Sequence, residues 1–88
     1  MISELWKVLQ GKKFETMQLQ VDNIIALGYP LNALLNQLHT HTVHHAELSD
    51  LDKAFICEKI AQADQYLIDG ANESLQLLDI CAFIMRRL

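Results

Sequence analysis

The stretch from Leu75 to Leu88, LQLLDICAFIMRRL, decides the fold class of this 88-residue chain. On a helix, where successive side chains turn by about 100°, its apolar residues occupy nearly the whole circumference and leave only a narrow polar sector around Asp79. A helix that is apolar on nearly every side must be buried on nearly every side. In so short a chain one side can enter the domain's own core, so we expect the rest to contact a partner or remain exposed.

The composition is that of a small all-α domain. Hydrophobic residues make up 51% of the chain, whereas glycine occurs three times and proline once. So few turn-forming residues argue against a loop-rich or disordered protein. A chain of this length forms one domain, and on folding it buries about 60–65% of the surface that the unfolded chain exposes. We therefore expect one modest core and a marginally stable monomer.

Residues that begin and end helices divide the chain into five apolar segments. Ser49 and Asn72 are typical N-cap residues, and Gly28 and Gly70 follow segments with helical apolar spacing. Pro30 fits the first turn of a helix, where its missing N–H is harmless. Short connections favour antiparallel neighbours, so we predict a compact five-helix bundle over residues 1–88. The predicted helices run from Ile2 to Leu9, Phe14 to Gly28, Pro30 to about His44, Ser49 to Asp69, and Asn72 to Leu88.

The predicted fourth helix carries two apolar stripes about 120° apart, and a helix with two such stripes is expected to contact two neighbours. A stripe alone does not say whose core it enters, so either one could face this domain or another chain. The first stripe consists of Ile56, Ile60, Ala63 and Leu67, and the second of Ala54, Cys57, Ala61 and Ile68.

The charge balance argues against nucleic-acid binding by this domain. Seven Lys and Arg residues stand against eleven Asp and Glu residues, so the net charge is −4 and the domain should repel a phosphate backbone. The basic doublets Lys12–Lys13 and Arg86–Arg87 are too sparse for a nucleic-acid footprint. The sequence has no signal-peptide pattern and no apolar run long enough to span a bilayer. We therefore expect no membrane partner, and Cys57 and Cys81 should be reduced core or interface residues of an intracellular protein.

The run HTHTVHH, from His39 to His45, is the one segment that looks like a chemical site. His41 and His45 have the i, i+4 spacing that lets two imidazoles reach one metal ion. A catalytic zinc site needs about three protein ligands and a structural one about four, and only Glu47 offers a nearby third. We favour histidines in the last turn of a helix, where positive charge is tolerated, and expect no metal site. A histidine-based metal-binding module is the alternative.

No residue pattern predicts catalysis. The carboxylates are scattered over solvent-facing positions, and no pair lies in apolar surroundings that would separate their pKa values. Ser49 and Ser74 have no base at a recognisable spacing and are explained as helix-start residues. The glycines are isolated at helix ends, so they form no phosphate-binding loop. We therefore expect that the chain is not an enzyme and has no catalytic or cofactor-binding residues.

Three sequence elements in the second half of the chain together resemble one known family. They are LSD at 48–50, EKIAQAD at 58–64 and LIDGANESLQLL at 67–78. With them, Leu48–Met85 is similar to the C-terminal collar domain of the small subunits of replication factor C, the eukaryotic clamp loader, with the greatest likeness to the subunit numbered four in animals. Leu31–Val43 and Phe14–Gly28 extend the resemblance over most of the chain.

The resemblance implies that residues 1–88 are one helical collar domain from a larger AAA+ subunit, which in the family also has an N-terminal ATPase module and a lid module. Five such domains form a ring, the collar that holds a heteropentamer together. The complex loads the PCNA sliding clamp onto primer-template DNA in nuclear replication and repair. In the family ATP and magnesium bind to the ATPase module, so the resemblance implies no cofactor in this domain. It also implies that PCNA and DNA are contacted by the rest of the complex and not by this domain.

The apolar pattern and the resemblance lead to one expected mechanism. The apolar sides of the fourth and fifth helices that cannot reach the domain's own core should contact adjacent replication factor C subunits, and an isolated domain should self-associate. The alternative is a free-standing helical protein-interaction adaptor, distinguished by whether the reading frame continues upstream into a phosphate-loop ATPase. The expected interface residues are Cys57, Ile68, Ile80, Phe83, Ile84 and Leu88.

Overall fold

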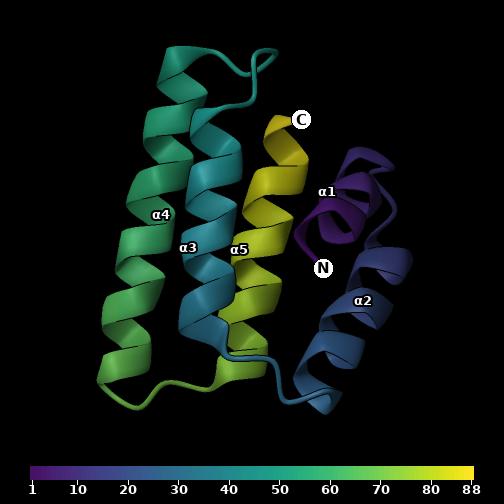
Figure 1. Cartoon of the computed structure of the whole chain (residues 1–88), viewed down its shortest axis with the longest axis vertical. Helices are drawn as coiled ribbons and strands as arrows, with labels where there is room; N and C mark the ends of the chain where they lie inside the picture. Colours follow the sequence, from purple (N-terminus) through teal and green to yellow (C-terminus); the bar gives the residue numbers. More distant parts are fainter.

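Five α-helices make up the computed structural model, which describes all of residues 1–88 (Figure 1). The structure has no strands, so the predicted all-α, five-helix fold is confirmed. None of the five helices combines the length and apolar character that crossing a membrane requires. The helices are α1 (Ile2–Gln10), α2 (Phe14–Ala26), α3 (Leu31–Val43), α4 (Asp50–Ile68) and α5 (Glu73–Arg87).

Side-chain caps and glycines in the left-handed backbone conformation set the helix boundaries as predicted, except at Pro30. The Asp52 backbone N–H donates to Ser49 Oγ over 3.1 Å, and the Leu75 N–H donates to Asn72 Oδ1 over 3.0 Å, so α4 and α5 begin with satisfied donors. Gly28 follows α2 and Gly70 follows α4, with φ values of 70° and 93° that other residues rarely adopt. Pro30 adopts an extended conformation and caps α3, so it precedes the first turn rather than occupying it.

Helix α5 lies at the centre of the arrangement (Figure 1). It packs against α4 on one side and α2 on the other, and it also contacts α1. Helices α3, α4 and α5 run antiparallel in succession, because each short connection reverses the chain. The short α1 contacts α2, α3 and α5 and so covers the remaining side of the core.

The central position of α5 corrects the expectation that much of its apolar surface is left for a partner. Its inward residues are fully buried, and most of its other apolar residues are partly buried against the same core. Only Leu75, with 64% of its surface exposed, is a strongly exposed large apolar residue on this helix. The helix is buried on nearly every side, as predicted, but by its own chain. The fully buried residues are Leu77, Ile80, Cys81 and Ile84.

The two stripes of α4 have different environments. The first stripe enters the core through Ile56, Ile60 and Ala63, all of which are buried. The second stripe is largely uncovered, because Ile68 is 73% exposed and the two alanines are also exposed. Helix α4 nevertheless packs against both α3 and α5, so its own chain supplies the two neighbours that were expected for it.

Trp6 joins α1 to the end of α3 by packing against two histidines. Its ring centre lies 4.5 Å from that of His41 and 5.2 Å from that of His45, and the two imidazole centres are 6.3 Å apart. Only 3% of Trp6 is exposed, and its indole N–H is buried without a hydrogen-bond partner. Burial, and to a lesser extent the nearby His45, lowers the pKa of His41 below its ordinary value of 6.5.

Truncating the central helix inside the core should destabilise the domain strongly. Ile84→Ala removes a fully buried side chain and leaves a cavity, so we expect a loss of about 2–5 kcal/mol in the free energy of unfolding. The matched control, Leu75→Ala, lies on the same helix at an exposed position and should cost less than about 0.5 kcal/mol. Urea unfolding followed by circular dichroism measures both. Equal losses would contradict the central position of α5.

Acidification should weaken the packing of Trp6 through His41. Because the folded state lowers the pKa of His41, the unfolded chain binds more protons, and stability present above pH 6.5 is lost as the pH falls below it. The melting temperature should therefore fall between about pH 7.5 and about pH 5.5, and it should fall less in His41→Gln. The control His39→Gln, at an exposed position, should keep the full pH dependence. A wild-type pH profile in His41→Gln would refute the assignment.

Candidate subunit interface

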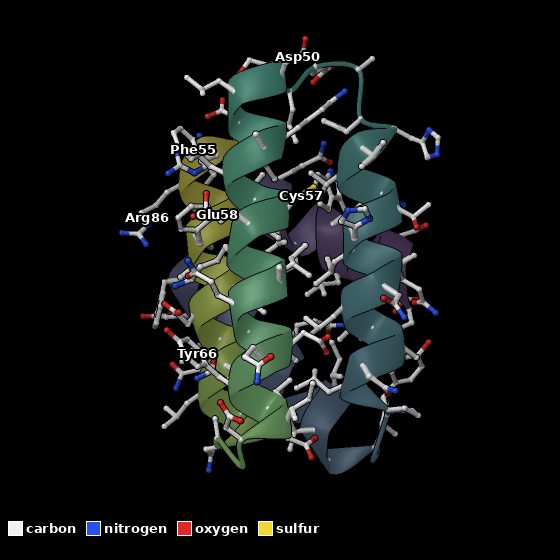
Figure 2. The ribbon with its side chains drawn as sticks, turned by 90° about the vertical axis from the view of Figure 1, so that its left-hand side faces the viewer. Asp50, Phe55, Cys57, Glu58, Tyr66 and Arg86 are labelled. Carbon is white, nitrogen blue, oxygen red and sulfur yellow. The ribbon has the colours of Figure 1, made fainter.

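Large apolar side chains are exposed on α4 more than on any other helix. Leu51 is 65% exposed, Phe55 40%, Tyr66 51% and Ile68 73%. Phe55 and Tyr66 lie on the side of α4 that adjoins α5, whereas Cys57 lies on the side toward α3 (Figure 2). Contiguous exposed apolar surface on a small domain commonly marks a contact site.

Aromatic and basic residues of α4 and α5 form a continuous surface, which we call the α4–α5 face. Its members are Phe55 and Lys59 from α4 and Phe83 and Arg87 from α5. The guanidinium carbon of Arg87 lies 4.2 Å from the centre of the Phe83 ring and 5.1 Å from that of Phe55, so the cation is held between rings from two helices. Each such contact stabilises the pair by about 0.5–1 kcal/mol at a partly exposed site.

Carboxylates pair with both cations of the α4–α5 face. Lys59 Nζ lies 2.7 Å from Asp79 Oδ2 and 5.7 Å from the centre of the Phe83 ring. Arg87 Nη1 lies 3.6 Å from Asp52 Oδ1. These pairs are partly exposed and add no more than about 1 kcal/mol each to stability. They nevertheless fix both cations, so a protein covering this face would bury aromatic rings without leaving an unpaired charge.

The structure separates the six expected interface residues into core and surface. Ile80 and Ile84 have no exposed surface, so the expectation that they reach a neighbour is corrected: the central position of α5 places both in this domain's own core. Cys57, Phe83 and Leu88 are half-buried, and Ile68 is exposed. Phe83 alone of the six belongs to the α4–α5 face.

Sequence reasoning missed Phe55 and the position of Arg87. Phe55 lies outside both apolar stripes of α4, and an aromatic residue on the polar side of an amphipathic helix was a signal that could have identified it. Arg87 drew attention only as part of a basic doublet that is too sparse for a nucleic-acid footprint. Its packing between Phe55 and Phe83 depends on the pairing of α4 with α5, which no local pattern reveals.

The histidine segment and the two cysteines contain the chain's imidazole and thiol groups. No group of three or more His, Cys, Asp or Glu side chains is placed to hold a metal ion, so the metal-module alternative gains no support. His41 and His45 instead pack against Trp6. Both cysteines are free, and burial raises the pKa of Cys81 to about 12, so its sulfur remains an unreactive thiol.

Comparison with known proteins identifies relatives over almost the whole chain. The family model described as replication factor C C-terminal domain matches residues 1–83. Replication factor C subunit 2 of Oryza sativa subsp. japonica is 38% identical over 87 residues, which are 99% of this chain and 26% of that protein. Replication factor C subunit 4 of Arabidopsis thaliana is 37% identical over 82 residues, which are 92% of this chain and 24% of that protein. Replication factor C subunit 4 of Homo sapiens is 38% identical over 87 residues, which are 99% of this chain and 24% of that protein.

The chain spans about a quarter of the length of the curated relatives it matches. Relatives named subunit 2 and subunit 4 match it about equally well, so the likeness does not distinguish between these two subunits. The resemblance carried by the elements in 48–50, 58–64 and 67–78 is confirmed at the level of the family. By its match over nearly all of its length, this chain belongs to the replication factor C C-terminal domain family.

Proposed function

We propose that this chain is a collar domain that joins its subunit to the neighbouring subunits of a replication factor C complex, and that the α4–α5 face makes the contact. The observation that carries the proposal is the packing of the exposed Phe55 and the half-buried Phe83 around Arg87, in a domain whose central helix is already buried by its own chain. Family membership supports the choice of partner.

The chemistry of the α4–α5 face suits a protein partner. Aromatic residues and Arg are enriched at the centres of protein interfaces and supply much of their binding energy. Phe55 and Phe83 present ring surface, and Arg87 keeps both rings in place on two helices. Leu51 stands four residues before Phe55, on the same side of α4, and extends this apolar surface toward the start of the helix.

In this proposal the domain assembles the complex, and other parts of the subunit perform the chemistry. ATP and magnesium would bind to the ATPase module of the subunit. Loading of the PCNA clamp onto primer-template DNA in the nucleus would be the activity of the assembled heteropentamer. The domain's net charge of −4 fits a role in which DNA is held elsewhere.

Placing a charge on the α4–α5 face should weaken assembly. In the full subunit that carries this domain, co-expressed with the other subunits of its complex, Phe55→Asp and Phe83→Asp should each lower the recovery of partner subunits roughly tenfold. The control is Leu19→Asp, which introduces the same carboxylate in place of a large apolar side chain at a 71% exposed residue of α2, a helix that lies away from α4 in Figure 1. Recovery with this control should equal that of the wild type.

Melting temperatures measured on the same subunits separate assembly from folding. Phe55 is exposed enough that its substitution should leave the melting temperature nearly unchanged, whereas Phe83 is half-buried and should lower it modestly. Normal recovery of partners with both variants would exclude the α4–α5 face as the contact. The same would follow if Leu19→Asp reduced recovery as strongly as they do.

A further inference from the structure

A second surface lies at the end of the bundle opposite the chain's C-terminus, where the α2–α3 and α4–α5 connections meet (Figure 1). An open hollow of about 710 Å³, which we call the loop-end hollow, is formed there by residues from both connections. Its apolar lining includes Ile25, Leu31, Leu67 and Ile68, and its carboxylates are Asp64 and Glu73.

The apolar part of the loop-end hollow remains accessible. Ile68 is 73% exposed, and Leu27, beside the lining residue Gly28, is 66% exposed. Tyr29, which also lines the hollow, accepts a hydrogen bond of 2.9 Å at its hydroxyl from Gln37 Nε2. The tyrosine is therefore anchored to α3, and the hollow does not depend on a side chain that is free to turn away.

The charged side chains at this end of the bundle are all negative. The segments that form it, residues 20–35 and 64–78, contain Asp22, Asp64, Asp69 and Glu73 but no Lys or Arg. The combined charge of these four carboxylates is as large as the formal net charge of the whole chain, which is −4. Helices α2 and α4 both end here, and neither has a basic residue in its last turn, where cations usually complement the carbonyl end of the helix.

We propose that the loop-end hollow binds a basic peptide segment of a partner protein. An apolar side chain of the segment would pack against Ile25 and Ile68, and Lys or Arg residues beside it would pair with Asp64 and Glu73. Charge complementarity selects this occupant, because a nucleic-acid strand or an acidic peptide would be repelled by the same carboxylates. The hollow is wide and open, which suits a peptide better than an enclosed small molecule.

This binding surface is separate from the α4–α5 face. The hollow shares no lining residue with Phe55, Lys59, Phe83 or Arg87. The inference therefore does not depend on the proposed role in subunit assembly, and its test uses the 88-residue chain by itself.

Fluorescence anisotropy with a fluorescein-labelled peptide of sequence GKRLFKRKG tests the proposal. The chain should bind this peptide, and a peptide with Glu in place of every Lys and Arg should not bind. The double variant Asp64→Asn with Glu73→Gln keeps the shape of both side chains and should weaken binding about fivefold, because two partly exposed ion pairs are lost. Ile68→Ser, an exposed substitution, should also weaken it.

A matched control and a map of the contact make the outcome decisive. The double variant Glu47→Gln with Asp50→Asn removes the same charge at the other end of α4 and should bind the basic peptide like the wild type. Backbone amide shifts in NMR spectra should change mainly in residues 25–32 and 64–73. Equal weakening by both double variants, or shifts confined to other residues, would overturn the proposal. It would also be overturned if the chain did not bind the basic peptide, or if sedimentation showed a dimer that Ile68→Ser converts to a monomer, which would place a second copy in the hollow.

Discussion

The burial of α5 by its own chain is the constraint on which the rest of the structure depends. This helix is apolar around most of its circumference, and the fold satisfies it by placing α4 and α2 on its two sides with α1 against a third. Ile80 and Ile84 thereby become core residues with no exposed surface. Since α5 packs against α1, α2 and α4, the other elements are arranged around it, and the domain's surface is determined by what they leave uncovered.

What they leave uncovered is mostly on α4, the longest helix. One of its sides enters the core, and its exposed surface carries two features with different chemistry. Toward α5, Phe55 and Phe83 enclose Arg87 in an aromatic surface suited to another folded domain. At its C-terminal end, Ile68 borders a hollow whose carboxylates suit a basic segment. A single domain could thus hold a neighbouring subunit and a separate peptide at the same time.

The sequence predicted the five helices well because local chemistry specifies their boundaries. Ser49 and Asn72 cap their helices through hydrogen bonds to residues three positions later, which do not depend on tertiary contacts. Gly70 ends a helix because glycine tolerates a positive φ. Which apolar residues of α5 remain on the surface was predicted less well. Apolar periodicity states how much of α5 must be buried but not which chain buries it, so Ile80 was assigned to a partner. The packing of Arg87 between two rings required the pairing of α4 with α5, which is a tertiary fact.

Hydrogen–deuterium exchange of the full subunit, free and in the assembled complex, tests the central claim most directly. If α5 is buried by its own domain, its amides should exchange slowly in the free subunit, and assembly should add protection mainly to residues 50–59 of α4. Exchange in α2 should be unchanged. Rapid exchange of α5 in the free subunit, followed by protection only on assembly, would show that a partner buries this helix and would contradict the account.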